Sequence, residues 1–156
     1  MIVCKGGEDS MTIDSFRGKY AFLSNFYMCP VSVPVGNETL TFQNTEAAFQ
    51  AMKDVSRAKE FCGLGPSAAK RKGRDVSLRP DWDSVKDDIM RMVIRCKFTQ
   101  NHELTGLLLA TEDAELVEGN TWNDRYWGVC DGRGKNRLGQ LLMELRTELR
   151  QEGRHG

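Results

Sequence analysis

Three side chains that could do chemistry together lie at helical spacing within the segment 42–53. Glu46, Gln50 and Lys53 occupy positions i, i+4 and i+7, which share one face of an α-helix. A carboxylate, an amide and an amine on one face can be presented to a ligand. A solvated helix surface carries the same residue types, so at this point both interpretations stand.

The position of Glu46 bears on its ionisation. It falls in the first turn of the predicted helix, for which Asn44 or Thr45 is the expected N-cap. The positive end of the helix dipole favours the carboxylate, whereas burial favours the neutral acid, and only an apolar cleft would make Glu46 a proton donor. Lys53 lies roughly 10 Å further along the axis, so we expect the two groups to meet only across a shared ligand.

A second acidic residue, Asp124, precedes two aromatic residues in the segment 123–128. A carboxylate there could serve as acid, base or charge stabiliser, and aromatic faces stack on nucleobases. A turn capped by Asp124, with Trp127 filling the core, accounts for the same residues at least as well.

Two basic segments could hold phosphate. Residues 70–74 contain four cations, and the glycine-rich segment 132–136 places Arg133 and Lys135 before a predicted helix. The second segment lacks the third glycine of a dinucleotide fingerprint and the Ser or Thr of a P-loop. Solvated charged surface is the alternative for both segments.

Charge and cysteine content narrow the classes of protein. The 22 basic and 22 acidic residues cancel, so no global field attracts nucleic acid or a membrane, although a local basic patch remains open. Five widely spaced cysteines without a CxxC pair, and two histidines, predict neither a disulfide scaffold nor a metal site. No membrane-length apolar run or signal-peptide pattern occurs, so we expect a cytoplasmic protein.

The patterns predict one α+β domain, predominantly helical with a small antiparallel sheet. Short β-prone runs at 20–27, 31–35 and 39–42 suggest a meander or hairpin, and 114–117 suggests another strand. Helices are expected from Asn44 or Thr45, over 55–62, from Ser67 to 74, from Asp81 to Cys96, over 102–110 and over 138–149. We expect 1–12 to be a loose lead-in, 13–150 the domain and 151–156 a fraying polar tail.

Eight motifs in a characteristic order resemble the NADAR domain, the family of YbiA-like N-glycosidases, over about residues 14–150. Each motif is weak alone, but their common order makes the match specific. They are Phe22-Leu-Ser-Asn-Phe26, Glu46-Ala-Ala-Phe-Gln-Ala-Met-Lys53, Ala69-Lys-Arg-Lys-Gly-Arg74, Asp81-Trp82, Lys97-Phe98, Leu108-Leu-Ala-Thr111, Asp124-x-x-Trp-Gly128 and Gly134-Lys-Asn-Arg-Leu-Gly139-x-Leu-Leu-Met143.

The resemblance implies hydrolysis of an N-glycosidic bond to ribose, without a cofactor or metal. The implied substrates are ADP-ribosylated guanine in nucleic acid or phosphorylated ribosylamino-pyrimidine intermediates of riboflavin synthesis; no membrane and no stable protein partner are expected. It implies catalytic roles for Glu46, Lys53 and Asp124. Contacts to sugar or base are implied for Ser24, Asn25, Phe26, Gln50, Trp82 and Trp127, phosphate contacts for Lys70, Arg74 and Asn136, and a further substrate contact for Gly128.

The residue types suit this chemistry. Cleavage builds positive charge on the sugar carbon, which a carboxylate stabilises while a second group protonates the leaving nitrogen or activates water. An amine could also attack ring-opened ribose and form a Schiff base. Two other classes remain open: a non-catalytic module that binds ADP-ribose or a nucleotide, and a structural or partner-binding domain, for which no exposed apolar helix or coiled-coil repeat is evident.

Two positions depart from the family pattern. Residue 47 is Ala where YbiA-type members have His, which would alter contacts near Glu46. Cys130 stands in a stretch where the family usually has glycine, and it is either a reactive thiol or a buried small residue.

Overall fold

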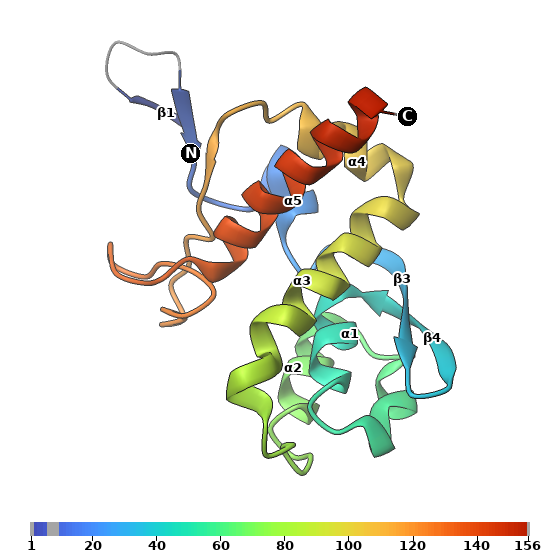
Figure 1. Cartoon of the computed structure of the whole chain (residues 1–156). Helices are drawn as coiled ribbons and strands as arrows, with labels where there is room; N and C mark the ends of the chain where they lie inside the picture. Colours follow the sequence, from blue (N-terminus) through green and yellow to red (C-terminus); the bar gives the residue numbers. More distant parts are fainter. Residues whose placement is uncertain (1, 6–9, 156) are drawn as a thin grey trace. The chain divides into compact units, whose positions relative to one another are not determined.

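The computed structural model describes residues 2–5 and 10–155, which fall into two compact units (Figure 1). Unit 1 combines the described residues up to Ser24 with those from Glu103 onward, and unit 2 spans Asn25–His102. About half of the chain is helical, and the strands are few and short. The predicted α+β class, mostly helical with a small antiparallel sheet, is confirmed.

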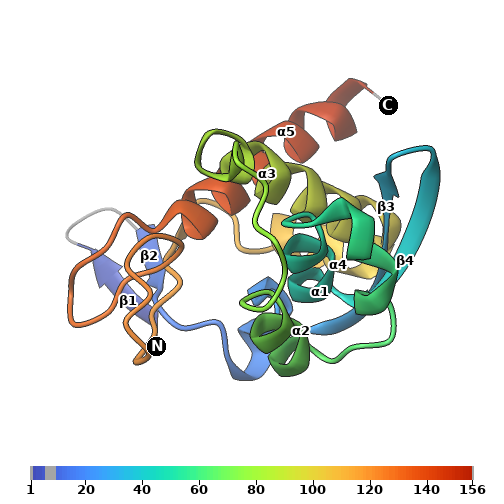
Figure 2. The ribbon, with the colours of Figure 1, turned by 90° about the horizontal axis from the view of Figure 1, so that it is seen from below.

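The hairpin of unit 2 consists of strands β3 (Met28–Val35) and β4 (Glu38–Asn44). They pair antiparallel with Val33 opposite Leu40, and Gly36 turns the chain with a φ of 63°. One face of β3 buries its valines at every second position, as a half-buried strand requires. The hairpin lies against helix α1 in both views (Figures 1 and 2), and its prediction from the sequence is confirmed.

Helix α1 (Thr45–Ala51) begins directly where β4 ends. The side chain of Asn44 accepts a hydrogen bond of 2.8 Å from the Ala47 N–H, so Asn44 is the N-cap. All seven helical residues are buried, which makes α1 the centre of unit 2. The helix is shorter than predicted, and Lys53 lies just beyond its C-cap, Met52.

Three further helical elements belong to unit 2. They are the 3₁₀ helix η2 (Val55–Phe61), α2 (Pro66–Lys72) and α3 (Trp82–Gln100). Proline at the first position of α2 makes Gly65 the N-cap, so the expected cap at Ser67 is wrong. Asp81 precedes α3 as predicted, but its carboxylate pairs with Arg79 at 2.6 Å and caps no backbone N–H.

Unit 1 contains a small sheet and a long helix with an apolar face. Strands β1 (Ile2–Lys5) and β2 (Ser10–Ile13) pair antiparallel, and β5 (Glu115–Leu116) joins β2 in parallel. The helical elements are the 3₁₀ helix η1 (Gly18–Leu23), α4 (His102–Leu109) and α5 (Arg137–His155). Helix α5 buries the five leucines that predicted it, which are Leu138, Leu141, Leu142, Leu145 and Leu149.

Three local expectations differ from the structure. The run 20–27 was expected as a strand but forms η1 and a turn, because the adjacent Phe22 and Leu23 are both buried and a strand would point them to opposite faces. The lead-in 1–12 contains β1 and most of β2. The polar tail 151–156 is helical up to His155, although it contains Gly153, and residue 156 lies outside the described residues.

Candidate functional site

Glu46 and Gln50 form a hydrogen-bonded pair inside unit 2. The Gln50 amide Nε2 donates to the Glu46 carboxylate Oε2 at 2.7 Å, and the Glu46 backbone N–H donates to the Asn25 carbonyl at 3.0 Å. The two side chains belong to residues that are only 9% and 6% exposed. This face of α1 is therefore not solvated surface, and its carboxylate is oriented by a neighbouring amide.

Two side-chain amide oxygens, one on Gln50 itself and one on Asn25, have no hydrogen-bond donor among the described residues. They are Oε1 of Gln50 and Oδ1 of Asn25, and both residues are more than nine-tenths buried. A buried acceptor without a donor costs about 1–3 kcal/mol, and a ligand hydroxyl or amine would remove that cost. Sequence reasoning missed a third such atom, Oγ1 of Thr45 at the start of α1, whose only signal is its place before Glu46.

Gly73 keeps the Gln50 amide in place. A Cβ atom at this position would lie 2.0 Å from Gln50 Oε1 and 2.8 Å from its Cδ. The backbone of α2 can approach the amide this closely only because residue 73 has no side chain. Gly73 was noted in the sequence only as part of a motif, because the contact joins two helices.

Lys53 has one negative and two positive neighbours that affect the pKa of its amine. Burial is the largest cause that lowers the pKa of its amine, and the Glu46 carboxylate opposes that effect. The cations Arg74 and Lys70 lower the Lys53 pKa further. A lowered pKa raises the fraction of neutral, nucleophilic amine at a given pH.

Aromatic rings accompany the two lysines of this cluster. The Lys53 Nζ lies 5.7 Å from the centroid of the Trp82 ring, and that ring packs on Phe49 with centroids 5.1 Å apart. The Lys70 Nζ lies 5.9 Å from the Phe26 centroid. Phe26 is 40% exposed and Trp82 only 8%, so Phe26 offers the larger face to a ligand.

Asp124 lies in unit 1, where it organises a turn. Its Oδ1 accepts hydrogen bonds from the N–H groups of Tyr126 and Trp127, at 3.1 and 2.9 Å. Asn120 brackets the same turn, because its side chain bonds both the N–H and the carbonyl of Asp124. The capping role considered from the sequence is present, and it uses one carboxylate oxygen and leaves Oδ2 outside these bonds.

Asn136 and Gly128 are built into the backbone framework of unit 1. The Asn136 side chain accepts from the Glu118 N–H at 2.9 Å and donates to the Leu116 carbonyl at 2.9 Å. A Cβ atom on Gly128 would lie 1.8 Å from Glu118 Oε2. Both residues therefore hold the segment after β5 against the start of α5, and a phosphate contact from Asn136 stays a prediction.

The other predicted site residues and the two positions that depart from the family pattern, Ala47 and Cys130, differ in their exposure. Trp127 is half-buried and meets Tyr126 edge to face at 4.8 Å between centroids, and Ser24 lies at the C-cap of η1. Cys130 is 5% exposed, so it is a buried small residue, and Ala47 is completely buried. Unit 2 thus gathers Asn25, Phe26, Glu46, Gln50, Lys53, Lys70, Arg74 and Trp82, whereas Ser24, Asp124, Trp127, Gly128 and Asn136 belong to unit 1.

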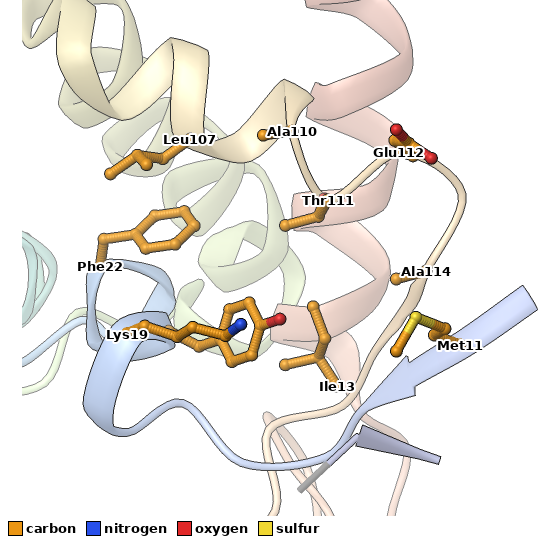
Figure 3. A pocket seen from close by; sticks show the side chains of 10 residues that line it. Met11, Ile13, Lys19, Phe22, Leu107, Ala110, Thr111, Glu112 and Ala114 are labelled. Atoms are coloured by element: carbon orange, nitrogen blue, oxygen red, sulfur yellow. The ribbon is translucent and has the colours of Figure 1, made fainter. Parts of the chain in front are cut away.

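A pocket of about 450 Å³ in unit 1 was not foreseen from the sequence (Figure 3). Its wall is mainly apolar and comes from β2, η1, α4 and the chain between α4 and β5, including Ile13, Phe22 and Leu107. Lys19 and Glu112 supply charge at its edge (Figure 3). No residue predicted to contact substrate lines this pocket.

Metal binding has no obvious site in the described part of the chain. Residues 2–5 and 10–155 contain no group of three or more His, Cys, Asp or Glu side chains that could hold a metal ion. A reaction without a metal or cofactor stays a prediction. The same residues contain no helix long and apolar enough to cross a membrane.

The groups in unit 2 define a class of site. A buried carboxylate, two amide acceptors without donors and a cluster of three cations suit an anionic ligand that carries hydroxyl or amine groups, such as a phosphorylated sugar or nucleotide. The chain belongs to the NADAR domain family, whose model matches residues 14–150. The resemblance drawn from the motifs is confirmed.

Known relatives carry related names. The N-glycosidase YbiA of Escherichia coli (strain K12) is 47% identical over 136 residues, which cover 83% of this chain and 82% of the relative. The solution NMR structure of E. coli YbiA matches with a TM-score of 0.78 at 43% identity, over 93% of this chain and 89% of that one. A riboflavin biosynthesis protein of Vibrio vulnificus is 37% identical over 138 residues, or 85% of this chain but 36% of that protein.

Proposed function

We propose that this protein is an N-glycosidase that hydrolyses the bond between ribose and a nitrogen atom of a base or amine. The observation that carries the proposal is the buried Glu46 carboxylate, oriented by Gln50 and electrostatically linked to Lys53. The E. coli relative named N-glycosidase supports the reaction class. The proposed substrates are ADP-ribosylated guanine in nucleic acid and phosphorylated ribosylamino-pyrimidine intermediates of riboflavin synthesis.

Glu46 would stabilise the positive charge that develops on the ribose carbon. Its hydrogen bond from Gln50 and its place in the first turn of α1 both favour the ionised form, while burial opposes it. The donor-free oxygens of Gln50 and Asn25 would accept hydrogen bonds from sugar hydroxyls. Lys70 and Arg74 would hold the phosphate. A catalytic role for Asp124, which belongs to unit 1, stays a prediction from the family resemblance.

Lys53 offers a covalent route within the same proposal. In ring-opened ribose that still carries the base, the neutral amine would attack the C1=N carbon and expel the base nitrogen, which takes up the two amine hydrogens and leaves as free amine. Water would then hydrolyse the Lys53 imine to the sugar aldehyde and free Lys53. Borohydride added during turnover would reduce the imine and leave ribose attached to Lys53. Turnover without any such adduct on Lys53 would leave the covalent route unsupported.

The decisive test compares Glu46 variants on both substrates. Glu46→Gln keeps an oxygen for the Gln50 amide but removes the charge, so we expect release of free base or ADP-ribose to fall by about 100-fold or more while the protein stays folded. Glu103→Ala, at an exposed position in the first turn of α4, is the matched control and should keep full activity. Unchanged activity in Glu46→Gln would refute the assignment.

A non-catalytic module that binds ADP-ribose or a nucleotide is the second candidate. The observation in its favour is that the donor-free oxygens and the three cations would serve binding alone. Calorimetry with ADP-ribose, followed by chromatography of the mixture with each ribosylated substrate, separates the two. Stoichiometric binding with no released base would favour the module.

A further inference from the structure

The segment 121–137 of unit 1 combines exposed aromatic surface with a net positive charge. Trp122 is 51% exposed, the largest exposed aromatic ring among the described residues. Four of the 17 residues in the segment are Arg or Lys and two are Asp, which gives a net charge of +2 in a chain whose total is zero. We call residues 121–137 the aromatic–basic segment.

Backbone hydrogen bonds hold the two halves of this segment together. The Lys135 N–H donates to the Arg125 carbonyl at 2.9 Å, and the Arg137 N–H donates to the Tyr126 carbonyl at 3.0 Å. These bonds place two cationic residues, Arg125 and Lys135, next to each other although ten positions separate them. A further pair of bonds joins Cys130 and Arg133 at the tip.

Three cations of the segment, Arg125, Arg133 and Lys135, have a weak carboxylate partner or none among the described residues. Arg133 and Lys135 are exposed and have no carboxylate partner among the described residues. The Lys135 Nζ lies over the Tyr126 ring, 5.4 Å from its centroid. Arg125 meets Asp131 only at 3.8 Å, and the Asp131 side chain is 87% exposed, so this ion pair contributes little.

We propose that the aromatic–basic segment is a docking surface for single-stranded nucleic acid, with a base stacked on Trp122 and the backbone phosphates held by Arg125, Arg133 and Lys135. An aromatic face with nearby cations is the combination that binds single strands without sequence preference. A duplex would keep its bases stacked away from Trp122, and an acidic peptide would use the cations but has no base for the ring. The inference rests on the proposed function for its use in catalysis, because a protein that acts on a modified base within nucleic acid must also bind the strand that carries the base.

Binding can be tested without turnover. An unmodified, labelled single-stranded DNA of about 12 nucleotides is titrated with the protein, and fluorescence anisotropy is recorded at several salt concentrations. RNA of the same sequence and the corresponding duplex are run beside it. We expect either single strand to bind more tightly than the duplex and Trp122 emission to be quenched on binding; no binding at low salt, or preference for the duplex, would overturn the proposal.

Three variants separate stacking from charge. Trp122→Ala should weaken single-strand binding by about tenfold, whereas Trp122→Phe, which keeps an aromatic face, should weaken it less. Arg133→Ala/Lys135→Ala should reduce the slope of log K against log salt by about 1.4, for two lost phosphate contacts. Arg57→Ala/Lys59→Ala, in η2 of unit 2, removes the same charge and should leave the slope unchanged; equal effects of the two double variants would overturn the proposal.

The strand-binding experiments test the docking surface whether or not the protein is a glycosidase. If no ribosylated substrate is hydrolysed but Trp122-dependent binding is measured, the proposed function fails and the docking surface stands. If small ribosylated nucleotides are hydrolysed but wild type and Trp122→Ala bind the strand equally, the docking surface fails alone. Circular dichroism of each variant establishes that it is folded. The chain has three tryptophans, so loss of the quenching in Trp122→Phe assigns it to Trp122.

Discussion

The amine of Lys53 is subject to opposing charges that single substitutions can remove. Glu46 raises its pKa, while Arg74 and Lys70 lower it in addition to burial. Removing the Glu46 charge should therefore lower the Lys53 pKa, and removing the charge of Arg74 or Lys70 should raise it. This makes the electrostatic description of the site testable without a substrate.

We predict that Glu46→Gln lowers the Lys53 pKa further below 10.5 and that Arg74→Gln raises it. Reductive ¹³C-methylation of the lysines and NMR titration would follow the Lys53 signal, which Lys53→Arg identifies by its loss. Lys59→Gln, in the exposed η2, is the control and should leave that signal unchanged. Shifts of the same sign in the Glu46 and Arg74 variants would contradict the description.

A second lysine, Lys97, is completely buried on α3. Burial lowers its pKa to about 8, and the neighbouring Cys29 opposes that shift. Its Nζ lies 5.1 Å from the Phe98 centroid and 5.7 Å from that of Tyr27. In the unfolded chain Lys97 would titrate near 10.5, so between pH 8 and 10.5 the unfolded state binds more protons and the folded state gains stability as pH rises.

We therefore predict that the wild type gains ~2 kcal/mol of unfolding free energy between pH 8 and pH 10 relative to Lys97→Met. Below pH 8 both states are protonated, so the cost of burying the charge is then fully present in the wild type. Urea unfolding of the two proteins at both pH values measures the difference. A parallel pH dependence in wild type and Lys97→Met would show that Lys97 does not titrate in this range.

Helices α1 and α2 meet through Gly73 and Gln50, so a change on one helix acts on the other. We predict that Gly73→Ala displaces the Gln50 amide, breaks its bond to Glu46 and lowers the rate of substrate cleavage by about tenfold or more, for a lost charge-assisted hydrogen bond. Gly63→Ala is the matched control, because a Cβ atom there meets nothing within 4 Å. Equal rates for the two variants would argue against this contact.

The N-cap of α1, Asn44, should contribute to the free energy of unfolding. Asn44 is completely buried, caps the Ala47 N–H and also donates to the Leu64 carbonyl at 3.0 Å. We predict that Asn44→Ala costs about 1–2 kcal/mol of unfolding free energy, measured by urea denaturation. Asn44→Asp keeps the capping oxygen but loses the donor to Leu64, so it should recover part of the loss; a full loss in both variants would show that the cap contributes nothing.

Long, regular elements were predictable and long-range contacts were not. Helix α5 and the β3–β4 hairpin have strong periodicity and clear turn residues, so they follow from the local sequence. Helix η1 was missed because the run 20–27 contains four aromatic residues, which favour strands. In the site, the face of Glu46 and Gln50 was predicted from spacing, but the approach of Gly73 and the two backbone bonds of Asn136 depend on residues 18 to 23 positions apart.

The whole molecule carries no net charge at neutral pH, and its isoelectric point is near 6.7. Proteins associate and precipitate most readily where their net charge vanishes. We predict a solubility minimum near pH 6.7 and higher solubility at pH 8.5, measured by polyethylene glycol precipitation. Arg57→Glu/Lys59→Glu, which removes two positive charges and adds two negative ones, should move the minimum to lower pH; an unchanged minimum would point to apolar association instead.

The direct junction of β4 and α1 constrains how chain length can vary. Asn44 is at once the last residue of the strand, paired with Met28, and the cap of the helix. One residue inserted between Phe42 and Glu46 would turn α1 by 100° about its axis, so the Glu46 N–H would lose its place at the Asn25 carbonyl and the Gln50 amide its place at Gly73. Insertions and deletions among natural homologues are therefore expected at the Gly36-Asn37 turn, and the interval from Phe42 to Glu46 should keep a constant length.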